Sequence, residues 1–338
     1  MRISILIPTF NRRDKVVSLL NSLNQFINSK SEYVNSYEII ISDNCSTDGT
    51  NEAINEFISD KFNFRYYRQT TNVGFDCNVK FLYDKSTLDY VWYLSDDDIV
   101  NEDALGIIIS TLSSETPDVL LFSFAQPREN KNLTFNVNEP FENIFQIDDI
   151  VKYVAYYPKL SIYVLKRVGL NIGDNELLDA VIGNGYYFVS LAFSILSKSK
   201  NPQLTLISKQ LASCDDDFKC FSINPDVFLN FYKTFEHPFV DLMGPNFIKQ
   251  KMELSYVNTL EYLFKIKEGV FIVNDISFYN GYIKKFRFNG NILLTNPLLL
   301  IQFVLLKLGW VKYYLKLGNP FYLKVIKPLR NFTKFLLK

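Results

Sequence analysis

The stretch Tyr90–Val100, "YVWYLSDDDIV", runs from apolar residues straight into three consecutive carboxylates and then turns apolar again. A short apolar run of this kind is typical of a buried strand. Asp96, Asp97 and Asp98 repel one another, which raises the pKa of each carboxyl group unless a cation or a set of hydrogen-bond donors offsets the charge. The stretch therefore predicts a strand whose end lies next to something positive.

The residues around this stretch predict further strands and helices in alternation. The strands are "ISILI", "YEIII" and "FRYYR" before it and "DVLLFSF" after it. Between the first two strands, Val16, Leu20, Leu23 and Ile27 recur at helical spacing and indicate one amphipathic helix. Alternation of short strands and helices is the signature of βαβ units. We therefore predict an α/β fold, with a mostly parallel, Rossmann-like sheet flanked by helices.

Polar loops follow the predicted strands. They read "PTFNRRD", "SDNCSTDGT", "QTTNVGFDCN" and "SDDD". In an open parallel sheet, ligands bind outside the carboxyl ends of the strands, which is where these loops lie. Turn formation accounts for some of the Asn, Asp and Gly residues. It does not require carboxylates at three of the four strand ends, so this edge of the sheet is the predicted binding site.

The composition fits a globular protein and excludes some function classes. The chain has 338 residues, 48% of them hydrophobic, which is enough for a large packed core. It carries 36 basic and 36 acidic residues, and this balance argues against a protein that neutralises nucleic-acid phosphates over its whole surface. Cys45, Cys77, Cys214 and Cys220 lack the paired spacing of a zinc site, which favours reduced thiols.

The charges are distributed unevenly along the chain. After Asp275 there is no acidic residue, whereas eleven Lys and Arg residues are interleaved with Leu, Phe, Tyr and Trp310. We expect a catalytic domain over residues 1–220 and a helical, basic, aromatic-rich region over 221–338. The second region suits docking on an anionic membrane surface. The alternatives are a spanning helix and a helical pair packed on the first domain. No secretory signal is visible at the N-terminus, so we expect a cytoplasmic protein, peripheral on the inner face of the membrane.

Four of the stretches, taken in order, resemble glycosyltransferase family 2. They are "ISILIPTFNR", "EIIISDNCSTDGT", "TNVGFDCN" and "WYLSDDD", and they cover about the first 125 residues. The resemblance implies a GT-A fold and transfer of a sugar from a nucleotide-diphosphate sugar, linked to UDP, CDP or GDP. The chain looks most similar to bacterial transferases of O-antigen or capsule assembly, including abequosyltransferase-like members. Their acceptor would be a lipid-linked oligosaccharide, with no nucleic-acid partner.

The resemblance also assigns a metal to the acidic triplet. Mn²⁺ or Mg²⁺ held by Asp96, Asp97 and Asp98 would bridge the donor phosphates, since hard cations prefer oxygen ligands. Two registers of the family motif are possible, Asp96 with Asp98, or Ser95 at the first position followed by Asp97 and Asp98. The competing interpretation is a solvated turn that caps the next helix.

By the same resemblance, residues of the other loops bind the nucleotide. Thr9 and Asp43 would line the nucleoside pocket, Asn72 and Gly74 would position the nucleotide, and Asp96 would contribute from the triplet. An ionised carboxylate at Asp43 would accept hydrogen bonds from the base or the ribose. The alternative for Asp43 is an Asx turn, and Asp48 is better explained as a helix cap.

An inverting transfer requires a general base, for which Asp179 in "LLDAVIGNGYYFVSLAF" is the first choice. Asp174, Glu176 and Asp215 to Asp217 are the other choices, and His237 reads as structural. Because the expected base is not obvious, a catalytically silent nucleotide-sugar or glycan-binding scaffold remains the alternative function. A cytidylyl- or uridylyltransferase is disfavoured because no Gly-rich phosphate loop follows "ISILIP".

Overall fold

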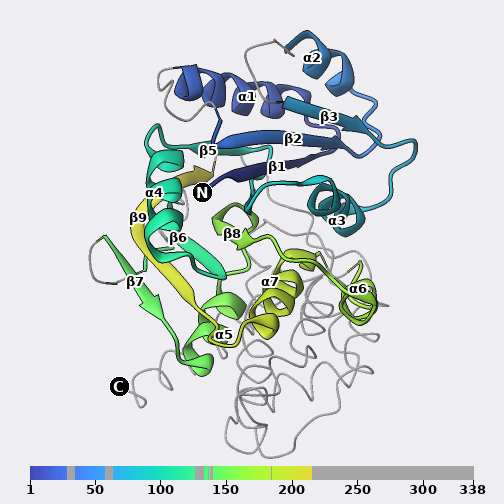
Figure 1. The fold of residues 1–338 in the computed structure, drawn as a ribbon. Helices are drawn as coiled ribbons and strands as arrows, with labels where there is room; N and C mark the ends of the chain where they lie inside the picture. Colours follow the sequence, from blue (N-terminus) through green and yellow to red (C-terminus); the bar gives the residue numbers. More distant parts are fainter. Residues whose placement is uncertain are drawn as a thin grey trace, which may run out of the picture. The chain divides into compact units, whose positions relative to one another are not determined.

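The computed structural model describes residues 1–28, 35–57, 64–125, 133–135, 137, 140–183 and 185–214 (Figure 1). All of them belong to the first of two compact units into which the chain divides. The predicted basic region, 221–338, lies outside the described residues, as do Asp215 to Asp217 and His237. The domain boundary and the membrane-docking segment therefore stay predictions.

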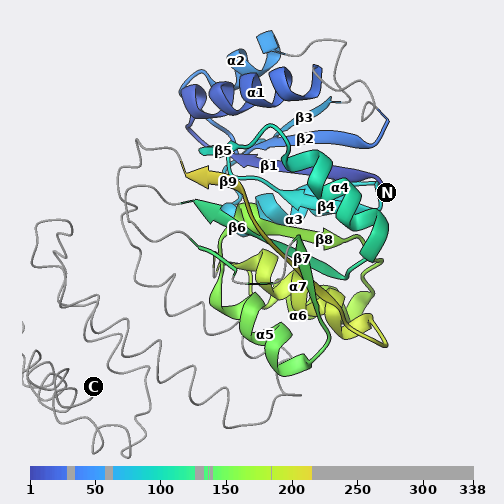
Figure 2. The same ribbon diagram turned by 90° about the vertical axis from the view of Figure 1, so that its left-hand side faces the viewer.

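Four parallel strands form the first part of the sheet, in the order β3-β2-β1-β4 (Figures 1 and 2). β1 (Ile3–Thr9), β2 (Tyr37–Asp43) and β4 (Tyr90–Tyr93) are buried along their whole length, as near-continuous apolar sequences require in a parallel sheet. β3 (Phe64–Arg68) is the half-exposed edge strand. These four strands were predicted from the sequence and are confirmed.

A helix follows each of the first three strands. α1 (Arg13–Asn28) buries Val16, Leu20 and Leu23, which confirms the predicted amphipathic stripe. α1 packs against α2 (Thr50–Phe57), and the two lie side by side in both views (Figures 1 and 2). α3 (Phe75–Lys85) packs against β1 and β2.

The second part of the sheet is mixed in direction. β8 (Tyr163–Lys166) lies antiparallel between β4 and β6 (Val119–Ala125). β9 (Leu204–Cys214) runs parallel to β6 and antiparallel to both β5 (Asp98–Val100) and β7 (Phe141–Ile144). Register shifts in the β6–β9 ladder let the long strand β9 reach β5. Only the β6 strand of this part was predicted. The sheet as a whole is mixed, because the second part adds antiparallel pairs and a single parallel pair, β6 with β9, to the parallel first part.

The remaining helices are α4 (Ala104–Glu115), α5 (Ile147–Tyr156), the short 3₁₀ helix η3 (Leu160–Ile162), α6 (Ile172–Asp179) and α7 (Tyr187–Lys198). α7 is buried from Tyr187 to Leu196 and packs against α3, β6 and β8. Among the described residues, no helix is both long and apolar enough to cross a membrane.

The strand order changes direction between β1 and β4. From β1 the chain moves outward to β2 and β3, and then returns to the other side of β1 to form β4. The loops after β1 and β4 therefore diverge at a topological switch point, where open α/β sheets bind their ligands. The acidic triplet follows β4 directly, so the fold places it at this position.

Candidate functional site

Asp96 and Asp97 share one guanidinium group at the end of β4. Arg12 Nη1 lies 2.8 Å from Asp96 Oδ1 and 2.6 Å from Asp97 Oδ2. Thr9, the last residue of β1, donates from Oγ1 to Asp96 Oδ2 at 2.6 Å. Ser95 Oγ donates to Asp97 Oδ1 at 2.6 Å. The structure thus brings together two predicted metal ligands and the predicted nucleotide-site residue Thr9.

Asp98 makes its contacts elsewhere. Its carboxylate accepts a hydrogen bond from Ser161 Oγ in η3 and lies 3.2 Å from Lys159 Nζ. Lys159 in turn lies over the ring of Phe124, 4.5 Å from its centroid. The triplet therefore divides into an Asp96–Asp97 pair with Arg12 and a buried Asp98–Lys159 pair. The expectation of positive charge beside the carboxylates is confirmed, and the protein supplies two such cations itself.

Burial makes the ionised form of these carboxylates costly. Desolvation raises the pKa of Asp96 to about 6, although Arg12 and the Thr9 hydroxyl oppose the shift. Desolvation likewise raises the pKa of Asp98, against the opposing effects of Lys159 and Ser161. Burial would lower the pKa of Arg12, but Asp96 and Asp97 outweigh it and raise that pKa. The single positive charge of Arg12 thus offsets only part of the negative charge of the Asp96–Asp97 pair.

The carboxylate pair fits a divalent cation. Arg12 Nη1, one nitrogen of the cationic guanidinium, is in contact with one oxygen of Asp96 and one of Asp97. Mg²⁺ is usually held by one or two carboxylates together with substrate phosphates. Within the described ranges, no group of three or more His, Cys, Asp or Glu residues is placed to hold a metal. The protein's share of such a site is therefore the pair, and Asp98 is directed away from it.

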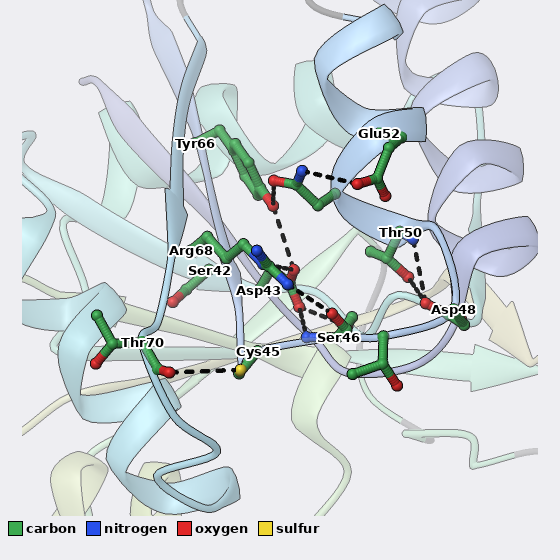
Figure 3. Close-up of polar contacts among 12 residues, drawn as sticks. Ser42, Asp43, Cys45, Ser46, Asp48, Thr50, Glu52, Tyr66, Arg68 and Thr70 are labelled. Atoms are coloured by element: carbon green, nitrogen blue, oxygen red, sulfur yellow. Dashed lines mark hydrogen bonds and ion pairs between the residues drawn. The ribbon is translucent and has the colours of Figure 1, made fainter.

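Asp43 lies at the centre of a polar cluster at the end of β2 (Figure 3). It ends β2 in register with Thr9, and its side chain is fully buried. Asp43 Oδ1 accepts from the Ser46 amide at 2.9 Å, while Oδ2 accepts from the Tyr66 hydroxyl at 3.2 Å and lies 3.6 Å from Arg68 Nε. Asp43 therefore bonds the backbone of its own loop, but three residues on rather than the two of an Asx turn. Any nucleoside contact adds to these bonds or is made through the more exposed Tyr66 and Arg68.

Asp48 makes the contacts of a helix cap. It accepts from the Thr50 amide at 3.1 Å, which satisfies an N–H group at the start of α2. It also accepts from the Arg13 amide at 3.0 Å, which ties the loop after β1 to the loop after β2. Hydrogen bonding to Thr50 and to backbone amides lowers the pKa of Asp48 despite its partial desolvation.

Asn72 and Gly74 hold the loop after β3 against the loop after β2. Asn72 Oδ1 accepts from the side-chain amide of Asn44 and from the backbone amide of Gly74, both at 2.9 Å. Gly74 has a φ of 85° at the start of α3, a conformation that L side chains rarely adopt. Asn72 is exposed and so are its neighbours Val73 and Phe75, so this loop borders the site at the protein surface.

The predicted base, Asp179, is the last residue of α6 and is exposed. Its carboxylate is paired with Lys80 of α3. Asp174, an alternative base, closes a capping box with Asn171 at the start of α6 and pairs with Lys198 at 2.5 Å. The structure gives Asp174 a structural role, whereas Asp179 stays accessible from solvent.

Sequence reasoning missed Asp76 as a site residue. Its buried carboxylate accepts three backbone N–H bonds, from Gly183 at 2.7 Å, Gly185 at 2.8 Å and Tyr187 at 3.2 Å. It therefore fastens the segment between α6 and α7 to the first turn of α3. The signal was present in "NVGFDCN", where an acid follows the loop residues, but its partners are more than a hundred residues away. Arg12 was missed for a similar reason.

The chain was compared with known proteins. The model of the family described as Glycosyl transferase family 2 matches residues 4–182. Abequosyltransferase RfbV of Salmonella typhimurium is 29% identical over 238 residues, which cover 65% of this chain and 68% of the relative. Poly(ribitol-phosphate) beta-N-acetylglucosaminyltransferase TarS of Staphylococcus aureus is 28% identical over 122 residues, which cover 36% of this chain and 20% of that protein.

Solved structures show the same fold. S. aureus TarS 1-349 in complex with UDP and in complex with UDP-GlcNAc match with TM-scores of 0.54 and 0.53, each at 16% identity over 70% of this chain. The matched parts are 65% and 66% of those structures, so this chain spans just under two thirds of each. Because the family model matches more than half of the sequence, the chain belongs to glycosyl transferase family 2 and is a glycosyltransferase with a GT-A fold.

Proposed function

We propose that the protein moves a sugar from a nucleotide-diphosphate sugar to a lipid-linked oligosaccharide in the assembly of a bacterial surface polysaccharide, O-antigen or capsule. The observation that carries the donor class is the Asp96–Asp97 pair at the switch point, within reach of one cation. The relatives agree with it, since one is named an abequosyltransferase and TarS was solved with UDP and UDP-GlcNAc. UDP, CDP and GDP donors all remain within the proposal.

Asp96 and Asp97 would hold Mn²⁺ or Mg²⁺ against the donor diphosphate. Enzymes of this family commonly use divalent metals. When bound, the metal stabilises the charge that develops on the departing nucleotide. Thr9 orients Asp96 by its 2.6 Å hydrogen bond. Asp98, fixed by Lys159 and Ser161, holds the start of β5 and thereby the turn that presents the pair.

The nucleoside would lie over the Asp43 cluster, between the loops after β1, β2 and β3. Asp43 offers acceptor oxygens only, and Tyr66 and Arg68 beside it add donors. Asn72 and Gly74 shape the rim of this pocket by holding the loop after β3 in place. The acceptor oxygens of Asp43 suit the N–H or O–H donors of a base or ribose. The donors of Tyr66 and Arg68 suit the carbonyl acceptors of a base.

Asp179 would take the proton from the acceptor hydroxyl in an inverting transfer. It is an exposed carboxylate, so a large acceptor can reach it, and its pairing with Lys80 of α3 holds the side chain at the end of α6. Asp76 supports it indirectly by fastening the segment that follows α6. A lipid-linked acceptor requires that the enzyme act at the membrane. We place it on the cytoplasmic face, with the basic region 221–338 as the docking segment.

The test is a panel of UDP-, CDP- and GDP-sugars incubated with the full-length protein, with release of nucleotide measured in Mn²⁺, in Mg²⁺ and in excess EDTA. We expect metal-dependent release from one donor class, lost at least tenfold in Asp97→Asn because one ligand charge disappears without a change of shape (about 1.4 kcal/mol or more). Full release of nucleotide in excess EDTA would refute the metal dependence. Binding of a donor without any turnover would favour the scaffold alternative. Failure of the full chain to sediment with anionic liposomes at low salt would remove the docking role.

A further inference from the structure

The Arg12 guanidinium occupies the contacts that a divalent metal would make at the carboxylate pair. It bridges Asp96 and Asp97 through one nitrogen, at 2.8 and 2.6 Å. The two carboxylates are largely buried, with side chains 5% and 15% exposed, whereas the Arg12 side chain is 34% exposed. The two carboxylates are therefore held in place by the protein, and the guanidinium lies on their solvent-exposed side.

The backbone around Arg12 is held while its side chain retains access to solvent. The preceding residue, Asn11, has a φ of 51°. Its amide donates to Ser46 Oγ and its side-chain oxygen accepts from the Thr47 amide, each at 2.8 Å. These bonds fix the start of the loop after β1 against the loop after β2. A long arginine side chain on a fixed backbone can move its guanidinium by several ångströms through rotamer changes alone.

The charge balance favours exchange of this cation. One guanidinium carries a single positive charge against two carboxylates whose side chains are largely buried. A divalent ion would match the pair in full. On binding with its diphosphate it would also bring negative phosphates next to the displaced guanidinium, and arginine pairs well with phosphate oxygens.

We propose that Arg12 is a resident counter-ion that holds Asp96 and Asp97 in the empty enzyme, yields them to the metal and then pairs with the donor diphosphate. This inference rests on the proposed function. It assigns Arg12 two opposite effects: it competes with free metal, and it assists binding of the metal–nucleotide complex. A residue that only stabilised the loop would not act with opposite signs on the two ligands.

The test measures free Mn²⁺ by electron paramagnetic resonance in titrations of the full-length protein at about pH 8, where the carboxylates are ionised. Wild type is compared with Arg12→Gln, which keeps an N–H donor on a shorter side chain but loses the charge, and with Arg12→Lys, which keeps the charge but loses the planar fork. Arg2→Ala is the matched control, because Arg2 also pairs with an aspartate, Asp89, but at the opposite end of β1. Urea unfolding of each variant establishes that it is folded.

Without nucleotide, we expect Arg12→Gln to bind Mn²⁺ about tenfold more tightly than wild type, and Arg12→Lys to lie between them. With Mn²⁺ saturating, we expect Arg12→Gln to bind UDP, CDP or GDP, whichever wild type prefers, about tenfold more weakly. Arg2→Ala should match wild type in both titrations. Mn²⁺ affinity of Arg12→Gln equal to or below that of wild type overturns the counter-ion role. Unchanged nucleotide affinity overturns the phosphate role. If wild type binds none of the three nucleotides with Mn²⁺, the proposed function itself fails.

Discussion

Replacement of Asp76 by Ala should loosen the segment between α6 and α7 and destabilise the protein. Asp76 is 3% exposed and accepts from the amides of Gly183, Gly185 and Tyr187. Gly183 is exposed, so water can replace its lost partner. Gly185 is half-buried and Tyr187 fully buried, and each buried unsatisfied donor costs about 1–3 kcal/mol.

The expected loss is therefore about 2–5 kcal/mol in the free energy of unfolding. It includes a few tenths to about 1 kcal/mol for a negative charge removed from the first turn of α3. Asp76→Asn should lose less, because one carbonyl oxygen still accepts. Asp14→Ala, an exposed carboxylate in the first turn of α1, is the control for a helix-dipole effect alone and should lose under about 1 kcal/mol.

Urea unfolding measures the stability, and amide hydrogen exchange locates the change. We expect exchange of the Gly183, Gly185 and Tyr187 amides to accelerate in Asp76→Ala by a factor that exceeds the effect on β1 or β2. Equal unfolding free energies for Asp76→Ala and Asp14→Ala would refute the reasoning. So would a loss of stability with unchanged relative protection of residues 183–187, since the effect would then arise within α3.

Three further predictions concern the carboxylates and thiols of the site. Burial raises the pKa of Asp96 to about 6, above its ordinary value, so protonated Asp96 stabilises the native state at low pH, and this stability is lost as the pH rises from about 4 to about 6. Asp96→Asn should therefore gain about 2–3 kcal/mol of unfolding free energy relative to wild type between pH 4 and pH 7, and a constant difference across that range would contradict the shift. Asp43→Asn should weaken nucleoside diphosphate binding more than it slows a saturated reaction, and calorimetry showing equal affinity would remove Asp43 from the site. Bound nucleotide should slow labelling of Cys45, whose thiol contacts the Thr70 carbonyl, and of Cys77; identical labelling rates would place both thiols away from the pocket.

The first part of the fold was predictable because its signals are local. Each of β1 to β4 is a short apolar or aromatic run, and α1 shows its stripe within three turns. β8 and β9 were not predicted. Their pairings join residues distant in sequence, such as Tyr90 with Lys166 and Asp98 with Cys214, and no local period announces them. The antiparallel insertion of β8 therefore had to come from the structure.

The location of the site was predictable because the carboxyl ends of parallel strands lie at the same edge of the sheet. Thr9 ends β1 and Asp96 follows its neighbour β4, and a 2.6 Å hydrogen bond joins the two side chains. The partners of the charges were not predictable, because a surface arginine such as Arg12 can turn toward any nearby acid. Lys159 arrives from a segment for which the sequence predicted no regular structure. The folded structure determines which basic side chain pairs with which carboxylate. The spacing of these residues in the sequence does not predict the pairing.

The three consecutive aspartates are distinguished by the direction of the chain at the end of β4. Asp96 faces the switch point, Asp97 lies at its rim, and Asp98 already belongs to β5, where pairing with Cys214 fixes its backbone. Because Asp98 has its own cation in Lys159, its compensation does not depend on Arg12. Exchange of Arg12 for a metal would alter the charge around Asp96 and Asp97 alone and leave the start of β5 in place. Asp96 and Asp97 can therefore change partners while Asp98 holds the turn that carries them.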